Sequence, residues 1–267
     1  MNISDMHILL TGATGGIGEA SAERLAQMGA RIIAVGRSPE ALAQLVERLP
    51  AHPQGAHSYV VADLCQQQDI DRLRTKVEGL EQPLNTLINM AGINALSLFE
   101  EQSSEQIRQI INTNLTGTML LTHALLPLLK AQPQARIVNV GSTFGSIGYP
   151  GYVSYCSTKF ALRGFTEALS RELSDSNVMV QYFAPRATRT GLNSDAADAL
   201  NEALNNSVDS PAEVARELFK FIQNPCANRF LGWPEKLFVK INGLMPGIVG
   251  NSINKQLHTI KGHAQTR

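Results

Sequence analysis

The sequence is poor in cysteine, has no excess of either charge and lacks long apolar runs, and each absence excludes a class of protein. Its three cysteines, Cys65, Cys156 and Cys226, lie far apart, so we expect no disulfide framework and no metal-binding cluster. Lys plus Arg and Asp plus Glu both total 23, which disfavours non-specific binding to nucleic acid. No run approaches the roughly 18 uninterrupted apolar residues of a transmembrane segment.

The N-terminus reaches its first apolar run, Ile8-Leu9-Leu10, within a few residues. No basic segment, apolar stretch and cleavage site precede that run, so we expect no signal peptide. Together with the odd number of cysteines, this predicts a cytoplasmic protein. Hydrophobic residues make up 43% of the 267 residues and charged residues 17%, which is ordinary for a globular protein.

Short apolar runs alternate with longer segments of helical periodicity. The predicted strands show little polar alternation, as expected when both faces of a sheet are covered; they are His7–Leu10, Arg31–Val35, Ser58–Val61, Thr86–Ile88, Arg136–Val140 and Val178–Phe183. The predicted helices are Glu19–Met28, Pro39–Leu49, Asp69–Glu78, Glu105–Lys130, Tyr152–Leu173 and Ala212–Ile222. This order predicts an α/β fold, a single-domain Rossmann-type doubly wound parallel sheet over residues 1–267. Pro127 predicts a kink or break in its helix.

A glycine-rich loop follows the first predicted strand and opens the first helix. There the backbone can turn tightly and approach a diphosphate at the positive end of the helix. A plain glycine-rich turn is the alternative, but the place between strand and helix favours a nucleotide site. The candidate cofactor residues in this loop are Gly12, Thr14, Gly15, Gly16, Ile17 and Gly18.

The end of the second predicted strand bears on the type of dinucleotide. An acidic side chain there would accept hydrogen bonds from the ribose hydroxyls of NAD. The chain instead has Gly36-Arg37-Ser38, and a guanidinium suits a 2′-phosphate, with the Ser38 hydroxyl beside it. A solvated surface arginine is the alternative. We therefore expect NADP(H) in preference to NAD(H).

Tyr155 and Lys159 lie four residues apart on one predicted helix, hence on one face. A nearby ammonium favours the phenolate, so we expect a lowered tyrosine pKa and a role in proton transfer. Ser142 sits just past the strand Arg136–Val140, at the carboxyl edge where open α/β sheets bind ligands. Asn114 lies within a helical pattern, where an amide is mildly unfavourable; an exposed helix asparagine is its alternative reading.

These motifs, spread from residue 8 to about 190, resemble the short-chain dehydrogenase/reductase family. Asn114, Ser142, Tyr155 and Lys159 match its catalytic tetrad. The resemblance implies that Ser142 orients a substrate oxygen and Tyr155 transfers a proton. Lys159 would bind the nicotinamide ribose and Asn114 would hold a water. It also implies cofactor contacts at Asp63, Leu64, Asn89, Ala91, Gly92, Pro185, Thr188 and Thr190, and it requires no metal.

The sequence departs from the family pattern at two positions. Met90 stands where the family has a second asparagine, and Arg186 where Pro-Gly usually follows the sixth strand. Arg186 is expected to alter the backbone, to reach an anionic group on cofactor or substrate, or to be an ordinary surface residue.

Substrate recognition is expected in three places. Phe144, Ile147, Tyr149 and Tyr152, beside Ser142 and Tyr155, would line an apolar, aromatic cleft. A substrate loop at about 186–212 and a C-terminal extension at about 233–267 would complete it. The apolar, helically spaced extension would cover the cleft, pack between subunits, or make weak peripheral contact with a membrane surface.

The sequence thus predicts an oxidoreductase that moves hydride between NADP(H) and a small-molecule substrate, an apolar ketone or secondary alcohol such as a 3-oxoacyl or steroid-like group. The alternative is a catalytically idle NADP(H)-binding regulator on the same fold. An epimerase or dehydratase is disfavoured by the absence of a larger substrate domain. The resemblance also implies a homodimer or homotetramer, assembled through the helices at 105–130 and 152–173.

Overall fold

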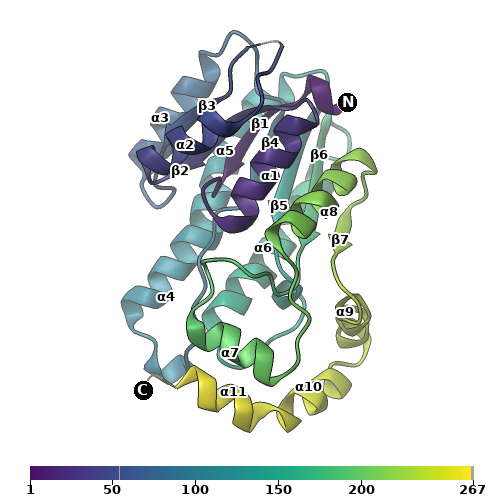
Figure 1. The fold of residues 1–267 in the computed structure, drawn as a ribbon. Coiled ribbons are helices and arrows are strands. Elements are labelled where there is room, and N and C mark those ends of the chain that lie inside the picture. The colour runs from purple at the N-terminus through teal and green to yellow at the C-terminus, as the bar shows by residue number, and fades with distance from the viewer. Residues whose placement is uncertain (54, 266–267) are drawn as a thin grey trace.

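The computed structural model describes residues 1–53 and 55–265, which form one parallel sheet covered by helices on both faces (Figure 1). The strands lie in the order β3-β2-β1-β4-β5-β6-β7, and every neighbouring pair is parallel. The strand bounds are β1 His7–Thr11, β2 Arg31–Gly36, β3 Ser58–Val61, β4 Thr86–Asn89, β5 Ala135–Val140, β6 Val178–Ala184 and β7 Asn228–Phe230. The doubly wound α/β fold expected from the sequence is confirmed.

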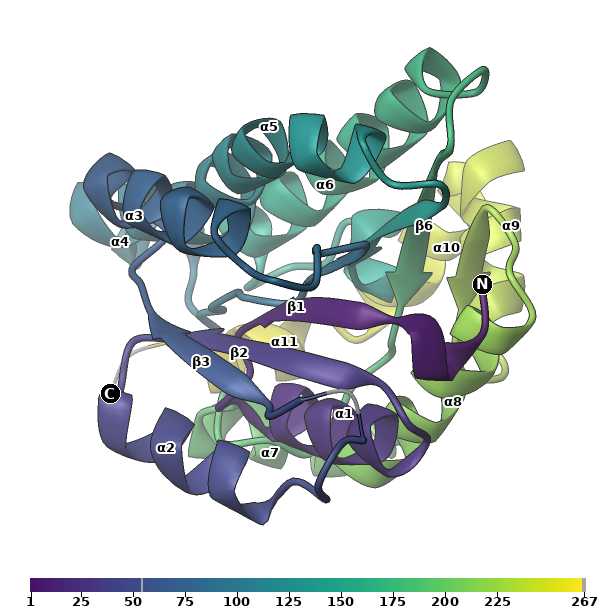
Figure 2. The same ribbon diagram turned by 90° about the horizontal axis from the view of Figure 1, so that it is seen from above.

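The helices divide between the two faces of the sheet, with α3, α4, α5 and α6 on one and α1, α2 and α8 on the other (Figure 2). Their bounds are α1 Gly16–Gln27, α2 Pro39–Arg48, α3 Gln67–Glu78, α4 Ser104–Ile111, α5 Gly117–Lys130, α6 Val153–Glu172, α7 Asp195–Ala203, α8 Pro211–Gln223, α9 Glu235–Leu244, α10 Pro246–Lys255 and α11 Leu257–Ala264. Short 3-10 turns occupy Ile3–Asp5, Phe99–Glu101 and Thr143–Gly145. Within the described residues, none of these helices has the length and apolarity needed to cross a membrane.

Successive side chains of each strand point to opposite faces of the sheet, so a separate hydrophobic core forms on each face. In β1, Ile8 and Leu10 pack with α1, α2 and α8 in one cluster, while Leu9 packs with α3 and α5 in the other. All three side chains are fully buried. This period of two explains why the strands read as continuous apolar runs, since both directions lead into a core.

The helical segment predicted at 105–130 is interrupted at a different place than its proline suggests. A break at Pro127 is wrong, because α5 continues through Pro127 to Lys130. The proline removes one backbone donor near the helix end, and the buried Leu121, Leu125 and Leu129 hold the segment against the sheet. The irregularity lies earlier, at Asn112–Thr116, where one π-helical turn joins α4 to α5.

Candidate active site

The glycine loop runs from the end of β1 into α1 and is held close to the end of β4. Gly12 has φ +66°, and a Cβ there would lie 2.9 Å from the Ala91 backbone. A Cβ on Gly18 would overlap the Gly12 carbonyl oxygen. The Thr11 hydroxyl accepts hydrogen bonds from the backbone N–H groups of Met90 and Ala91 at 3.0 and 3.1 Å. Because the loop consists largely of glycines, mainly backbone atoms surround the start of α1.

Arg37 and Ser38 follow β2 and have different surroundings. Arg37 is exposed and lines the large cleft described below. Ser38 is the N-cap of α2, where its hydroxyl accepts the Ala41 N–H at 3.2 Å. Its oxygen therefore has a structural partner, and it does not line the cleft.

The π-helical turn places Asn114 in the interior, where it is fully buried. Its amide oxygen accepts the Ile93 N–H at 2.7 Å, and its amide nitrogen donates to the Ile93 carbonyl at 2.8 Å and to Thr158 at 3.2 Å. The reading of Asn114 as an exposed helix residue is therefore wrong. Its side chain fixes the Gly92-Ile93 segment against α6, and π turns of this kind are common at functional sites.

Ser142, Tyr155 and Lys159 meet at the carboxyl edge of β5. Ser142 caps the short turn Thr143–Gly145 by accepting the Phe144 N–H at 3.1 Å, and its hydroxyl acts on the Tyr155 phenol, whose pKa it lowers. The ammonium of Lys159 donates to the Val140 carbonyl at 3.0 Å and lies 5.7 Å from the centre of the Tyr155 ring. The spacing seen in the sequence therefore brings these three groups together.

Burial dominates the proton affinities of this cluster. It raises the pKa of Tyr155, against the opposing effect of Ser142. It also lowers the pKa of Lys159 to about 8, from a usual 10.5. The sequence-based expectation of a lowered Tyr155 pKa is therefore not met in this structure, because the effect of burial exceeds the lowering effect of Ser142.

Four aromatic rings gather on one side of the cluster. Phe144 stacks on Tyr149 with centroids 4.9 Å apart, and it lies 5.3 Å from Tyr152 and 6.5 Å from Tyr155. Burial raises the pKa of Tyr152 to about 12 and also raises that of Tyr149, so both phenols are neutral at ordinary pH. The residues that the sequence suggested for substrate binding therefore form an uncharged aromatic wall beside the Tyr155 hydroxyl.

One cleft of about 1100 Å³ connects the glycine loop to this wall. It is lined by almost all of the residues predicted from the sequence: Gly12, Thr14, Gly15, Gly16, Ile17, Gly18, Arg37, Asp63, Leu64, Ala91, Gly92, Ser142, Phe144, Tyr149, Tyr152, Tyr155, Lys159, Pro185, Thr188 and Thr190. Ser38, Asn89 and Asn114 do not line it. Asn89 is buried between strands and donates to Thr122 and Asn139.

The structure adds Tyr182, Leu192 and Leu200, which the sequence did not single out. The Tyr182 hydroxyl on β6 lies 3.3 Å from both the backbone N and O of Ser142 and so supports that residue from below. Leu192 and Leu200 line the cleft from the substrate loop, as do Phe238 and Ile241 from the C-terminal extension. Of the three expectations for the extension, covering the cleft is the one that this lining bears out.

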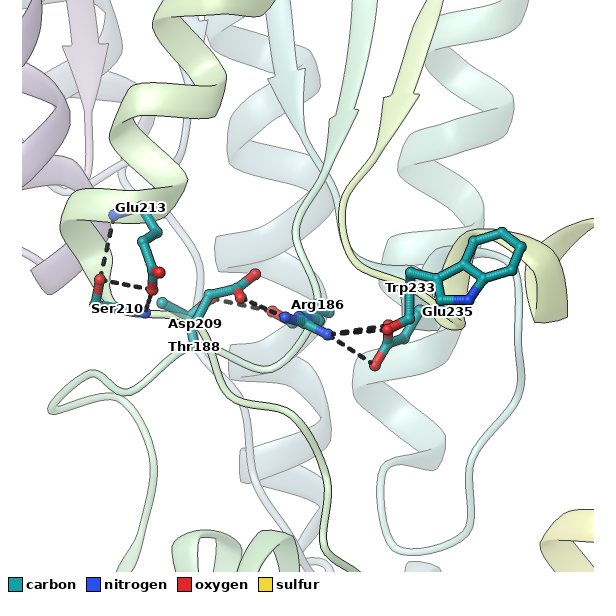
Figure 3. Close-up of polar contacts among 7 residues, drawn as sticks. All are labelled: Arg186, Thr188, Asp209, Ser210, Glu213, Trp233 and Glu235. Carbon is teal, nitrogen blue, oxygen red and sulfur yellow. Dashed lines mark hydrogen bonds and ion pairs between the residues drawn. The ribbon is translucent and has the colours of Figure 1, made fainter.

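Arg186 forms ion pairs with two carboxylates of its own chain (Figure 3). Its guanidinium pairs with Asp209 at 2.7 Å and with Glu235 at 3.3 Å, and the hydrogen bond to Asp209 raises its pKa. Its backbone does not adopt a positive φ. The cation is thus neither an ordinary surface residue nor one that distorts the backbone.

Comparison with known proteins identifies the family to which this arrangement belongs. A family described as short chain dehydrogenase matches residues 6–201. The chain belongs to the short-chain dehydrogenase family. Among the curated members of that family, the 3-oxoacyl-(acyl-carrier-protein) reductase FabG of Aquifex aeolicus is 33% identical over 213 residues, covering 78% of this chain and 86% of its own. Carbonyl reductase family member 4 of Danio rerio is 30% identical over 216 residues, covering 80% and 90%.

Solved short-chain dehydrogenases share the whole architecture. One from Sphingobium yanoikuyae, in complex with NADPH, has a TM-score of 0.78 at 26% identity and covers 92% of this chain and 95% of its own. One from Streptomyces avermitilis has a TM-score of 0.78 at 24% identity and covers 96% and 98%. The protein is therefore an oxidoreductase of the short-chain dehydrogenase family, as its sequence motifs implied.

Proposed function

We propose that this protein is an NADP(H)-dependent carbonyl reductase, or the reverse alcohol dehydrogenase, for apolar ketones and secondary alcohols. The observation that carries the proposal is the convergence of Ser142, Tyr155 and Lys159 on one cleft, at the point where its glycine-loop end meets its aromatic wall. The relatives named as reductases and the NADPH complex of a structural neighbour support it.

The residues present fit a nicotinamide dinucleotide. Gly12 and Gly18 let the loop backbone pack directly against the Ala91 backbone and against itself, where a Cβ would overlap. The diphosphate would meet backbone N–H groups at the start of α1. Arg37, exposed at the rim of the cleft, would pair with a 2′-phosphate. When bound, the nicotinamide supplies or accepts the hydride.

The side chains of the site would do the rest of the chemistry. The Ser142 hydroxyl, which already accepts the Phe144 N–H, can donate a hydrogen bond to a substrate carbonyl oxygen and so orient it. The Tyr155 hydroxyl would give its proton to the same oxygen as charge develops on it. Lys159 uses one N–H on Val140 and has two left for the ribose and for favouring the phenolate. Asn114 would keep the Ile93 segment, which lines the cleft, in place through its two hydrogen bonds to the Ile93 backbone.

Replacing Tyr155 by Phe tests the assignment. We expect turnover of NADPH with a cyclic ketone to fall by about 10²–10⁴-fold, the usual contribution of a positioned general acid, while NADPH affinity changes little. Tyr59→Phe, on β3 and outside the cleft, is the matched control. Unchanged turnover in Tyr155→Phe would refute the role.

Replacing Arg37 by Ala tests the choice of dinucleotide. Loss of a charge-assisted contact should weaken NADPH binding by about 10-fold or more and leave NADH binding unchanged. Equal effects on both dinucleotides would show that Arg37 does not read the 2′-phosphate. Tight NADPH binding by the wild type, without oxidation across a broad carbonyl panel, would favour the idle regulator instead.

An oligomer through α4, α5 and α6 belongs to the same proposal. Ile110, Leu121 and Leu125 are buried in the protein's own core, whereas Met119, Leu120 and Phe160 are exposed by about two fifths. Exposed apolar side chains grouped on these helices suit a subunit interface. Phe160→Lys should therefore lower the molar mass measured by light scattering; a monomeric wild type would contradict the interface.

A further inference from the structure

The side chain of Arg186 joins two segments that are far apart in the sequence. Its Nη2 atom lies 2.7 Å from Asp209 Oδ1, and its Nη1 atom donates to both oxygens of Glu235 at 3.3 and 3.4 Å. All three side chains are at most about a quarter exposed. A planar guanidinium can hold two carboxylates at once, which a lysine cannot match in geometry.

Asp209 stands at the closing end of the substrate loop. Its N–H donates to the Ala187 carbonyl, and its own carbonyl accepts the Arg189 N–H, both at 2.9 Å. The loop that leaves the sheet after Arg186 thus returns to its starting point at Asp209, immediately before the Ser210 cap of α8 (Figure 3). Between these ends lies α7, whose Leu200 lines the cleft.

Glu235 is the first residue of α9 and so begins the C-terminal extension. From there α9, α10 and α11 follow one another along the edge of the molecule, and α11 packs against α7 (Figure 1). Arg186 therefore closes a ring around the substrate end of the cleft: substrate loop, α11, α10, α9 and back to the loop.

The local backbone is adapted to this contact. Gly232 has φ +87°, and a Cβ there would lie 2.5 Å from Arg186 Cδ and 2.6 Å from Glu235 Oε2. Arg186 Nη1 also lies 3.5 Å from the Trp233 carbonyl oxygen. The chain between β7 and α9 thus passes directly beside the arginine, with room only for glycine.

We propose that Arg186 is a positioning residue that holds the substrate loop and the C-terminal extension together as one wall, and thereby determines affinity for large apolar substrates. The proposal rests on the carbonyl reductase function proposed above. A small ketone needs only Ser142 and Tyr155, whereas a larger one reaches Leu200 on the loop and Phe238 on α9. Separation of the substrate loop from the C-terminal extension should therefore weaken the binding of large ketones and leave the binding of small ketones unchanged.

The test compares Arg186→Gln with Arg189→Gln, an exposed arginine three residues away. For Arg186→Gln we expect the KM of a decalone to rise about tenfold, equivalent to about 1.4 kcal/mol. Its kcat, the kinetics with cyclohexanone and the affinity for NADPH should change less than about twofold. Glu235→Gln, which spares the contact with Asp209, should give a smaller shift of the same kind.

Hydrogen exchange of the NADPH-bound protein gives a second readout that needs no turnover. Amides in 189–208 and in 235–256 should lose protection together in Arg186→Gln and in neither segment of Arg189→Gln. Loss in one segment alone, equal KM changes for both ketones, or loss of NADPH binding would overturn the proposal. If the wild type reduces no ketone, the proposed function fails, and the exchange result still decides whether Arg186 joins the two walls.

Discussion

Replacing Lys159 by Met should stabilise the protein while it abolishes efficient turnover. The Lys159 side chain is 5% exposed, and burial lowers its pKa from 10.5 to about 8. At pH 7 the ammonium is charged in both the folded and the unfolded protein, so folding carries the full cost of its burial. A shift of this size corresponds to about 3 kcal/mol. Loss of the hydrogen bond to Val140 offsets about 1 kcal/mol of the gain.

The expected net effect at pH 7 is about 2 kcal/mol of added stability, which raises Tm by about 4–8 °C in a protein of this size. The gain should depend on pH in a defined direction. Between pH 8 and 10.5 the unfolded lysine binds a proton that the folded lysine has lost, so the wild type gains stability relative to the variant as pH rises. By pH 9.5 the difference should have nearly vanished.

Urea unfolding of the dinucleotide-free protein at pH 7 and at pH 9.5 measures both effects. Lys130→Met, at the exposed end of α5, is the control and should change stability little at either pH. A variant less stable than the wild type at pH 7, or a difference that does not shrink at pH 9.5, would refute the reasoning from burial. Activity with NADPH should fall in the same variant, as expected where a site keeps a costly group for function.

Two further substitutions test how the site is supported. Gly141→Ala places a Cβ onto the Tyr182 hydroxyl, so we expect a loss of about 1–3 kcal/mol and a displaced Ser142, measured by urea unfolding and by turnover. Asn114→Ala leaves both backbone groups of Ile93 without their partner, so we expect a loss of about 2–4 kcal/mol, with faster hydrogen exchange around Ile93.

Each of these substitutions has a matched control in the chain. Gly148→Ala meets open space, and Asn112→Ala alters an exposed residue of the same π turn. Both controls should unfold within about 0.5–1 kcal/mol of the wild type. A Gly141→Ala protein as stable as Gly148→Ala, or an Asn114→Ala protein as stable as Asn112→Ala, would contradict the contacts described for these residues.

The fold and most of the candidate site could be predicted because their signals are local. A strand buried on both faces reads as an apolar run, and β1 shows why, since Ile8 and Leu9 enter different cores. The glycine loop, Ser142 and Tyr155 follow or precede such runs, so chain order alone places them at one edge of the sheet.

The predictions that failed concerned properties that depend on solvent exposure or on residues far away in the sequence. The spacing of Tyr155 and Lys159 gave their proximity but not their burial, and burial reverses the expected shift of the Tyr155 pKa. Nothing near Arg186 in the sequence indicates Asp209 or Glu235, because the ion pairs form only when two separate segments return to the same point.

The irregular helix at 105–130 shows a further limit. Pro127 is the strongest local signal in that segment, yet α5 passes through it. The π turn at Asn112–Thr116 carries no proline or run of glycines. It is stabilised by what Asn114 meets across the site, the backbone of Ile93 and the hydroxyl of Thr158, and these partners lie outside any window of sequence.

The C-terminal extension is a basic segment of this neutral protein, and it packs through α11 against α7, which carries Asp195 and Asp198. Beyond Glu235 the chain has five of its 23 basic residues and none of its 23 acidic ones, and α9, α10 and α11 bring most of this segment to one edge of the molecule (Figure 1). A net charge of zero therefore conceals an uneven distribution. At pH 7 and low ionic strength the protein should be retained on a cation exchanger and released as the Debye length falls toward about 8 Å.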